Sequence, residues 1–496
     1  MRQGRLAGRY PAAAAMVVFA LIPYLALSAA LQPLTPIITR DLHMSLQTLS
    51  LGSGLANAGY ALGTVLAVAL AQHLPQRRLL VGYAALLVLG SLLTATAQNP
   101  AMFIGGHVLQ GLCTSLMLIA AVPPLALGFG TARFRETAVV MNLCIFGAVA
   151  LGPTIGGIQA QADAWRPLFF VVAGVSLAAL MLTVLTFEDA PPANRNAPFD
   201  PLAIALAGAG SVAAFFGASE LLTHQFLSPI TFVPLIGGLA LIVVLIVYQF
   251  RAKRPLLTIR SMLTSTMPVA GIVVALFAAA ASVSATALTA AILSGQYGPL
   301  HLGLLYLPEL AGAILTAFAL GIVITRREMH YLPLAGMVFL AAGIATFLIQ
   351  TPPSQTLTLI GSALTGIGLG ASVAPALFVA GFSLPAANLQ RVFAIIELLR
   401  AVAAFMIAPV FAHFAATVGG DVQSGTEIAL WIGLGLAIGA AVIAVALYAL
   451  GGARPQAPDL DRFMQGERAA WYSPPLLAAV RKRARRQSLA EEPSRA

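Results

Sequence analysis

Fourteen long apolar runs, joined by short polar connections, occupy nearly the whole of this 496-residue chain. The hydrocarbon core of a bilayer is about 30 Å thick, so a helix needs roughly 20 apolar residues to cross it. Strands of a membrane barrel would alternate apolar and polar residues, and these runs do not. The pattern therefore predicts an all-α polytopic membrane protein with fourteen transmembrane helices. The expected spans are residues 12–32, 49–72, 79–97, 101–128, 137–160, 166–187, 200–222, 229–250, 266–293, 302–324, 331–350, 355–382, 391–417 and 427–450.

Composition supports this class and excludes others. Hydrophobic residues make up 59% of the chain and charged residues only 9%, against about a quarter charged in soluble domains. The connections leave no room for an extramembrane catalytic domain, and no phosphate-binding GxxxxGKS or GxxxxGKT pattern occurs. We therefore expect neither an enzyme nor an ATP-driven pump, and no cofactor. Cys113 and Cys144 both fall inside spans, where they indicate packing rather than a metal site.

Basic residues predict the orientation of the chain. Of the 27 Lys and Arg, only Arg40 and Arg166 are expected on one side of the membrane and only Arg400 within a span. The others gather on the opposite side, which by the positive-inside rule is cytoplasmic. We expect an integral protein of the cytoplasmic (inner) membrane with both termini in the cytoplasm. The net charge of +10 then fits contact with anionic membrane lipids and requires no nucleic acid.

The polar connections divide the chain into four expected parts. Residues 1–190 form a bundle of six spans, residues 191–260 an insert of two spans with cytoplasmic linkers, and residues 261–450 a second bundle of six. Residues 451–496 form a basic cytoplasmic tail, whose segment Tyr472–Gln487 is either an amphipathic stretch on the membrane surface or disordered. Two bundles facing one another across a central cavity are the usual plan of a secondary transporter.

One glycine- and proline-rich motif lies in the fifth span. Residues 147–157 read GAVALGPTIGG. Pro153 frees a backbone carbonyl and bends the helix, and Gly152, Gly156 and Gly157 allow a neighbouring helix to approach closely. The segment resembles the fifth-helix antiporter motif of the major facilitator superfamily, in which this element is associated with control of leak through the cavity. A simple packing kink is the alternative interpretation.

Four further segments resemble the fourteen-span drug:proton antiporter branch of that superfamily. They are Phe199–Leu202 (FDPL), Arg251–Leu257 (RAKRPLL), His107–Gly111 (HVLQG), similar to the fourth-helix motif, and Glu397–Arg400 (ELLR), similar to an Asn-x-x-Arg element. The resemblance implies a major facilitator fold of two six-helix bundles plus two extra central helices.

The chain departs from the branch at three places within a resemblance that runs from about Pro36 to Tyr448. Leu27 stands where relatives commonly carry an acid in the first helix, and His107 stands where they carry Arg. Residues 69–78, ALAQHLPQRR, keep the basic pair of the loop between spans two and three but lack its Asp. Positions tied to proton coupling and gating are therefore altered.

Glu309 is the leading candidate for proton coupling. It follows Pro308 inside the tenth span, and an ionisable group within a membrane is expensive enough to be a functional candidate by default. Such a carboxyl suits the binding and release of protons during transport. A permanently protonated or hydrogen-bonded structural Glu is the alternative.

Three further residues join Glu309 as coupling candidates. Glu397 and Arg400 are three residues apart, so they share a helix face and can form an ion pair, either as a structural lock or as part of the transport cycle. His107 could accept a proton or simply bond a neighbour. Glu220, near the outer end of the seventh span, is expected to have a peripheral role.

Polar and aromatic residues within spans are the candidates for lining a substrate cavity, because amphiphilic ligands need apolar surface with a few polar groups. The same residues could instead form interhelical hydrogen bonds or lipid-facing anchors. These candidates are Gln32, Asn57, Tyr60, Gln110, Asn142, Tyr306 and Phe393.

The sequence predicts a secondary transporter that exports a small amphiphilic compound, a drug or toxic organic molecule by resemblance, through proton antiport and alternating access. Its expected partners are that substrate, protons and membrane lipids; no partner protein is indicated. One alternative is an exporter of an endogenous metabolite or natural product with weak or altered proton coupling. A transport-dead membrane sensor or scaffold is the alternative from another class, although such a protein has little need of GPTIGG or of buried acids.

Overall fold

The computed structural model describes residues 5–187, 192 and 199–482, and in this part of the chain every regular element is a helix. Thirteen of these helices are long and apolar enough to cross a membrane, and α14 is a shorter apolar helix at the place of the eleventh expected span. The all-α membrane fold expected from the sequence is confirmed. Arg195 and the tail beyond residue 482 lie outside the described residues.

The helices of the first half, before the insert, are α1 (Tyr10–Asp41), α2 (Leu46–His73), α3 (Gln76–Ala95), α4 (Pro100–Leu127), η1 (Thr131–Arg133), α5 (Phe134–Asn142), the π-helical η2 (Leu143–Gly147), α6 (Ala148–Gln161) and α7 (Arg166–Thr186). The insert contains α8 (Pro201–Glu220) and α9 (Pro229–Arg251). The second half contains α10 (Ile259–Leu263), α11 (Thr266–Leu293), α12 (Pro299–Leu305), α13 (Leu307–Val323), η3 (Arg327–His330), α14 (Leu332–Leu348), α15 (Gln355–Phe382), η4 (Ala386–Asn388), α16 (Leu389–Thr417), α17 (Val422–Gly451) and α18 (Leu460–Met464).

The observed helices follow the expected spans closely, and residues 266–293 and 355–382 coincide with α11 and α15. The first helix is longer than expected, because α1 continues through Pro33 and Pro36 to Asp41. Within a bilayer a backbone that leaves the helix loses its hydrogen bonds, so a helix continues past prolines that would end it in water.

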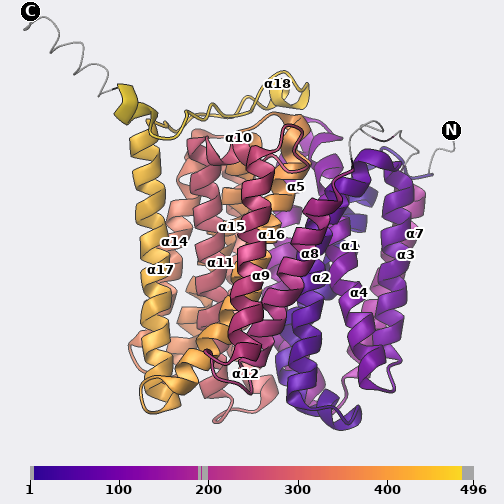
Figure 1. Cartoon of the computed structure of the whole chain (residues 1–496), viewed down its shortest axis with the longest axis vertical. Coiled ribbons are helices and arrows are strands. Elements are labelled where there is room, and N and C mark those ends of the chain that lie inside the picture. Colours follow the sequence, from indigo (N-terminus) through magenta and orange to yellow (C-terminus); the bar gives the residue numbers. More distant parts are fainter. Residues whose placement is uncertain (1–4, 188–191, 193–198, 483–496) are drawn as a thin grey trace, which may run out of the picture.

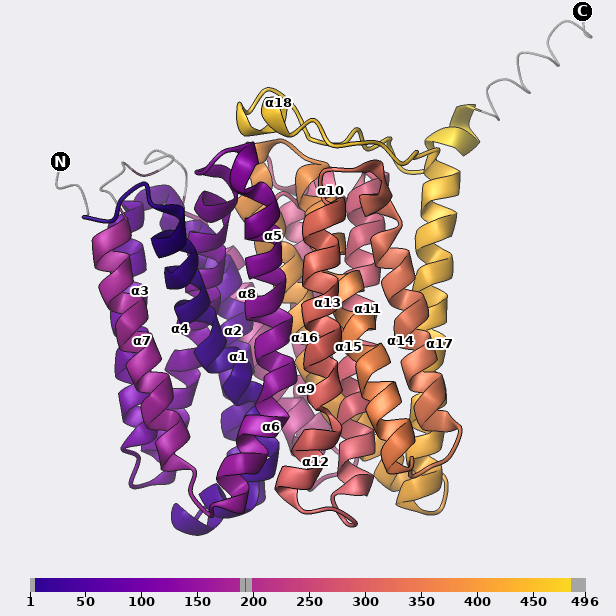
Figure 2. The same cartoon turned by 180° about the vertical axis from the view of Figure 1, so that it is seen from behind.

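The two halves lie side by side, and the insert covers one of the seams between them. In Figure 1, α8 and α9 lie in front of the junction, and α8 packs against both α2 and α9. The opposite view in Figure 2 shows the other seam, where α5 and α6 meet α13 and α12. We call the side at which α1 begins and α17 ends the terminal side, and the opposite side the distal side.

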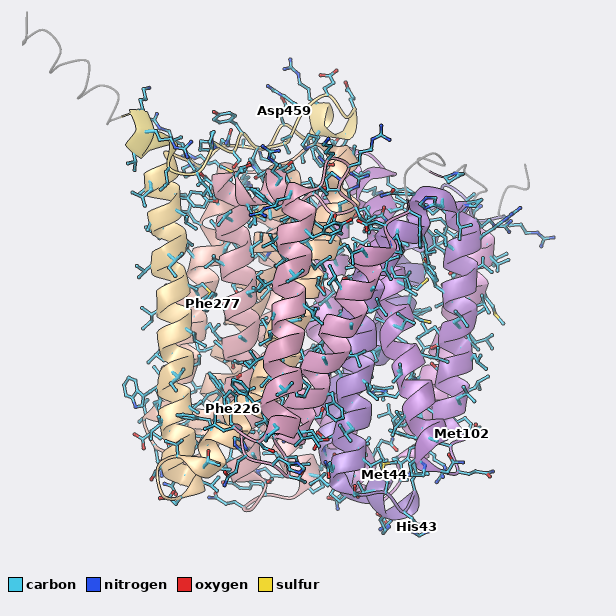
Figure 3. The ribbon with its side chains drawn as sticks, in the orientation of Figure 1. His43, Met44, Met102, Phe226, Phe277 and Asp459 are labelled. Atoms are coloured by element: carbon cyan, nitrogen blue, oxygen red, sulfur yellow. The ribbon has the colours of Figure 1, made fainter. Side chains whose placement is uncertain are left out.

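The segment after α17 crosses the terminal side as an ordered strap (Figures 1 and 3, with Asp459 labelled on it). The backbone N–H groups of Ala470 and Trp471 donate to the Phe382 carbonyl at 2.8 and 3.2 Å. Phe463 of α18 packs on Phe382 with 4.7 Å between ring centroids. The tail between Phe463 and Trp471 is therefore packed on the second half of the protein, and residues 483–487 of the segment expected at the membrane surface lie outside the described residues.

Candidate functional site

A buried ion pair on α16 is joined to the first half of the chain by a tyrosine. Arg400 Nη2 lies 2.6 Å from Glu397 Oε2, with side chains 7% and 4% exposed. The Tyr60 hydroxyl of α2 donates to Glu397 Oε2 at 3.1 Å, and Arg400 Nη2 donates to the Tyr60 oxygen at 3.4 Å. Glu397 and Arg400, three residues apart on α16, thus form the expected ion pair. Tyr60 links this pair to α2 in the first half of the protein.

Aromatic contacts lead from this cluster toward the distal side. Tyr24 of α1 stacks on Tyr60 with 5.9 Å between ring centroids, and its hydroxyl donates to Asn57 Oδ1 at 2.8 Å. The His107 ring of α4 lies 5.5 Å from that of Tyr24, and its Nδ1 is 3.2 Å from Gln110 Oε1. Tyr24, Asn57 and His107 therefore form a connected wall on the distal side of the ion pair.

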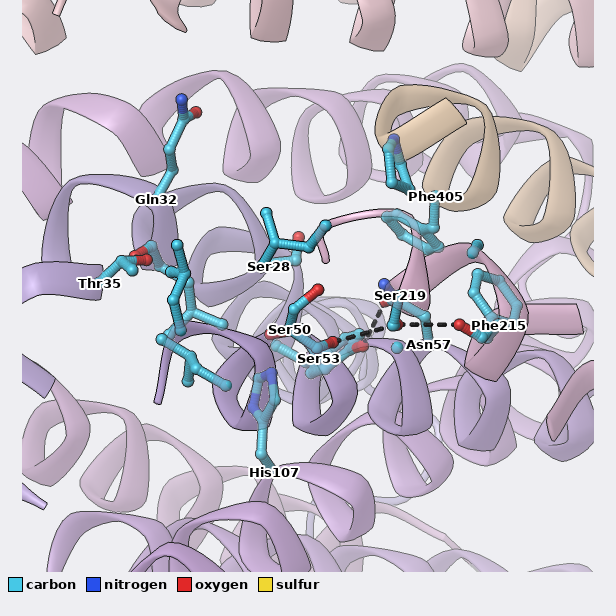
Figure 4. Close-up of a pocket in the computed structure, with 18 residues that line it drawn as sticks. Ser28, Gln32, Thr35, Ser50, Ser53, Asn57, His107, Phe215, Ser219 and Phe405 are labelled. Carbon is cyan, nitrogen blue, oxygen red and sulfur yellow. Dashed lines mark hydrogen bonds between the residues drawn. The ribbon is translucent and has the colours of Figure 1, made fainter. Parts of the chain in front are cut away.

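A cavity of about 390 Å³ lies against this wall in the distal half, between α1, α2, α4, α8 and α16 (Figure 4). Leu46, at the start of α2, and Leu222, just after α8, lie at its rim. Tyr24, Phe215 and Phe405 supply aromatic surface. Its volume falls within the range of sites for drug-sized ligands.

Two polar stripes supply most of the hydrogen-bonding groups of the cavity. One follows α1 with spacings of four and three residues, and the other follows α2 with spacings of three and four. Of these residues only Gln32 and Asn57 are among the candidates expected from the sequence, although a count of polar residues at helical period indicates the rest. The stripes are Ser28, Gln32 and Thr35 on α1, and Ser50, Ser53 and Asn57 on α2.

The insert forms a wall of the cavity. A Cβ built on Gly54 of α2 would clash with Ser219 of α8, so the two helices are in close contact. Glu220, the last residue of α8, is 2% exposed; it accepts a hydrogen bond from Gln47 Nε2 at 2.8 Å and lies 3.0 Å from His224 Nδ1. Glu220 therefore fastens the distal end of the insert to α2.

The glycines of GPTIGG lie against α1. A Cβ built on Gly152 would be 2.5 Å from Ala29 Cβ, and one on Gly156 would be 2.5 Å from the Ala30 carbonyl oxygen. Both glycines are buried. Because even one methyl group would collide with these atoms, the motif sets the separation of α6 and α1.

The same motif also contacts the second half of the chain. The Thr154 hydroxyl donates to the Gly303 carbonyl of α12 at 2.9 Å. A Cβ on Gly157 would lie 2.5 Å from the Pro299 carbonyl oxygen, and one on Gly303 would lie 2.7 Å from the Pro153 carbonyl oxygen. GPTIGG is therefore a backbone-to-backbone contact between the two halves on the distal side.

The tenth span is interrupted at Tyr306, between α12 and α13. Pro308 has no N–H to donate, and the Glu309 N–H bonds to the Tyr306 carbonyl at 3.0 Å. The Leu305 carbonyl accepts a hydrogen bond at 3.0 Å from Ser362 Oγ of α15 instead. A neighbouring helix thus satisfies a backbone group at the break.

Glu309 lies in the first turn of α13, just after this break. Its side chain is 5% exposed, and none of the described residues gives its carboxyl a hydrogen bond or an ion pair. A Cβ on Gly366 of α15 would clash with the Glu309 backbone, which shows how closely α15 covers it. Glu309 is thus buried without a partner, whereas Glu397 has both Arg400 and Tyr60.

The two halves are also in contact on the terminal side. The Phe134 ring of α5 lies 5.0 Å from that of Phe382 and 6.1 Å from that of Phe378, both on α15. Nearer the middle of the protein, Asn142 Nδ2 donates to the Gly370 carbonyl at 3.1 Å. These contacts close the seam between the two halves near the terminal side.

The remaining cavity candidates lie elsewhere. Tyr306 lines a different cavity of about 330 Å³, which also includes Gln32 and Pro153. Gln110 is fully buried and donates to Ser91 Oγ at 3.2 Å. Phe393, with 6.5 Å to the Phe378 ring centroid, belongs to the aromatic contact on the terminal side.

Tyr60 and Asn142 line neither cavity, and both are engaged in the contacts between the halves described above. Among the described residues, no group of three or more His, Cys, Asp or Glu is placed to hold a metal ion.

The family model of the Major Facilitator Superfamily matches residues 16–326. The chain belongs to the major facilitator superfamily. Members of this superfamily are transporters rather than enzymes, in agreement with the fold described above.

Curated relatives of this major facilitator protein include a multidrug resistance protein homolog and a resistance and export protein, both at modest identity. The chain is similar to "Multidrug resistance protein B homolog" of Mycobacterium tuberculosis, with 28% identity over 64% of this chain and 60% of the relative. It is also similar to "Tetracenomycin C resistance and export protein" of Streptomyces glaucescens, with 26% identity over 67% of this chain and 62% of the relative. The matches span about three fifths of the length of these relatives.

Two solved structures share the fold. The human organic anion transporter MFSD10 has a TM-score of 0.62 at 13% identity, covering 88% of this chain and 99% of its own. The proton:xylose symporter XylE has a TM-score of 0.61 at 12% identity, covering 88% and 95%. These likenesses are to the fold alone.

Proposed function

We propose that this major facilitator protein exports a small amphiphilic compound, a drug or another toxic organic molecule, from the cytoplasm by proton antiport. The terminal side, with its basic connections, is then cytoplasmic, and the distal cavity faces outward across the inner membrane. The relative from Streptomyces glaucescens, a resistance and export protein, supports export as the direction of transport.

The observation that carries this proposal is the distal cavity of about 390 Å³, which combines three aromatic rings with two polar stripes. Such a lining suits a ligand with both apolar and hydrogen-bonding surface. Alternating access requires the halves to separate on the terminal side, at Phe134 and Phe382, and to close over the cavity on the distal side.

Proton entry from outside supplies the driving force through Glu309. A buried carboxyl without a partner is costly when ionised and more stable when protonated. We infer that Glu309 carries the proton in one conformation and releases it when the tenth span moves at its break. Glu397 is a weaker candidate because Arg400 compensates its charge.

GPTIGG acts as the distal gate in this account. Its contacts with Pro299 and Gly303 hold the halves together on the seam opposite the insert, and substrate reaches the distal cavity from the side near α2, α8 and α16. Tyr60 and the Glu397–Arg400 pair hold α2 to α16 in this conformation.

The test of the proposal is transport by purified protein in proteoliposomes under an imposed pH gradient, with fluorescent amphiphiles as candidate substrates. Gradient-dependent movement that disappears when the gradient is collapsed supports proton-driven export. Transport that is indifferent to the gradient supports the alternative, an exporter of an endogenous metabolite with altered coupling, which Leu27 and His107 favour. Absence of any transport supports the sensor or scaffold.

A further inference from the structure

We propose that the distal cavity selects uncharged aromatic compounds that carry hydrogen-bonding groups, and that it discriminates against permanent cations. This inference rests on the proposed export function, because it names the substrate class of the same site. It follows from the absence of charged side chains in the cavity lining and from the amide and hydroxyl groups that face the cavity.

None of the 18 residues that line the cavity is Asp, Glu, Lys or Arg. The adjoining cavity of about 450 Å³, which shares Ser50, Ser219 and Leu222 with the first, also has no such residue in its lining. A cation in either space would therefore have no facing carboxylate.

Two buried acids on helices that line the cavity are already compensated. Glu397 is bound by Arg400 at 2.6 Å and by Tyr60 at 3.1 Å. Glu220 is bound by Gln47 at 2.8 Å, and its carboxylate lies 3.0 Å from His224 Nδ1. Neither carboxylate is available to a ligand unless one of these contacts breaks.

Aromatic rings do not replace the missing carboxylate. Tyr24, Phe215 and Phe405 line the cavity, and a cation over an aromatic ring gains a modest attraction. Removing an ion from water without a counter-ion costs more free energy than this attraction returns, so desolvation outweighs the cation–π contact. The histidines of the two linings, His107, His224 and His413, cannot carry a negative charge and supply no counter-ion.

The lining does offer unpaired hydrogen-bonding groups. Asn57 Oδ1 is occupied by the Tyr24 hydroxyl, which leaves its amide N–H₂ to donate. Gln32, Ser50 and Ser53 face the cavity without a side-chain hydrogen bond to any described residue. A neutral ligand with hydroxyl or carbonyl groups satisfies these positions, and its rings pack against the aromatic side chains.

The test uses two ligands of the same shape, 6-tert-butyl-2-naphthol and its trimethylammonium isostere 6-(trimethylammonio)-2-naphthol. Their affinities for the purified full-length protein in detergent are measured by fluorescence titration. We expect the neutral naphthol to bind at least about tenfold more tightly. Equal affinity, or preference for the cation, would overturn the inference.

Variants separate the role of the cavity from the general hydrophobicity of the ligands. Asn57→Asp keeps the acceptor for Tyr24 and places a carboxylate in the cavity, so it should reduce the preference about tenfold. Ser53→Asp is the second variant, in case the first folds poorly. Asn99→Asp makes the same charge change at the N-cap of α4, outside the cavity lining, and should keep the wild-type ratio.

Unchanged preference in both cavity variants would also overturn the inference, because the charge at this site would then be irrelevant. Transport of the two naphthols in proteoliposomes distinguishes the two proposals. If the pH gradient drives transport of both naphthols equally well, the inference is wrong and the proposed function stands. If the protein binds the neutral naphthol more tightly but transports neither, the proposed function is wrong and the inference stands. If neither naphthol binds, this cavity does not take aromatic amphiphiles, and the inference fails.

Discussion

Gly157 of α6 leaves no room for a side chain beside Pro299 of α12, since a Cβ on Gly157 would lie 2.5 Å from the Pro299 carbonyl oxygen. The two residues belong to different halves of the protein, and both lie in backbone that cannot move aside without shifting a helix. The close approach of the two halves on the distal side therefore requires a glycine at position 157.

Substitution of Gly157 should therefore impair transport more than folding. Overpacking a close contact costs about 1–3 kcal/mol, which corresponds to a loss of transport rate of about fivefold to 160-fold for Gly157→Leu if distal closure is required. Gly174→Ala in α7, where a Cβ meets nothing within 4 Å, is the control. The measurement is proteoliposome transport normalised to folded protein, and full activity of Gly157→Leu would reduce GPTIGG to a packing feature.

Pro153→Ala tests the bend rather than the contact. Alanine restores a helical N–H at this position, so α6 should straighten. The backbone carbonyl of residue 153 should then move away from Gly303. We expect transport to fall at least severalfold while most of the protein remains in the membrane. An unchanged rate would show that the bend is not required.

Removing one partner of the buried ion pair should destabilise the protein strongly. Glu397→Gln leaves the Arg400 charge buried without compensation, which costs about 3–5 kcal/mol. Tyr60→Phe removes only hydrogen bonds and should cost about 1–2 kcal/mol. Thermal unfolding in detergent compares the variants. In the double variant Glu397→Gln/Arg400→Gln the loss should be smaller than the sum of the single losses, and simple additivity would contradict the pair.

The strap on the terminal side should respond to pH through His330 of η3. Burial against Trp471, with 5.3 Å between ring centroids, lowers the pKa of His330 to about 4 from its usual 6.5. The folded state therefore holds His330 neutral, so its contribution is complete above pH 6.5 and is lost as the pH falls toward 4. The full effect is about 3 kcal/mol.

This pH dependence is measurable as the unfolding temperature between pH 7 and pH 4.5. His330→Gln cannot titrate and should flatten the part of the profile that depends on this group. His43→Gln, at the distal edge of the protein (Figure 3), changes another histidine far from the strap and should leave the profile as it is. An identical profile for His330→Gln and the wild type would contradict the assignment.

The sequence predicts the spans well because length and hydropathy alone determine whether a segment crosses a bilayer. The break at Tyr306 and the π-helical turn at residues 143–147 were not anticipated, since each depends on neighbours, as the Ser362 hydroxyl on the Leu305 carbonyl demonstrates. The helical period of Ser50, Ser53 and Asn57 marks one face of α2, but only the folded arrangement shows that α1, α8 and α16 meet this face around a cavity.

Acidic residues within the expected spans indicated candidate site residues better than hydroxyl residues did. Glu309, Glu397 and Glu220 could each be singled out from sequence because charge in a membrane is expensive. Their partners could not, apart from Arg400, because Tyr60 and Gln47 come from helices distant in sequence. The folded arrangement shows that, within the described part of the chain, Glu309 differs from the other two in having no hydrogen-bond or ion-pair partner.

The measurement that tests the account most directly is efflux driven by an imposed pH gradient in proteoliposomes containing Glu309→Gln. Glutamine keeps the size and polarity of the side chain but cannot carry a proton, so gradient-driven efflux should fall to the background of protein-free vesicles. Substrate exchange without a gradient should persist. Glu328→Gln, an exposed acid of η3 outside the spans, should retain normal efflux. Normal gradient-driven efflux in Glu309→Gln would contradict the assignment of proton coupling to this residue.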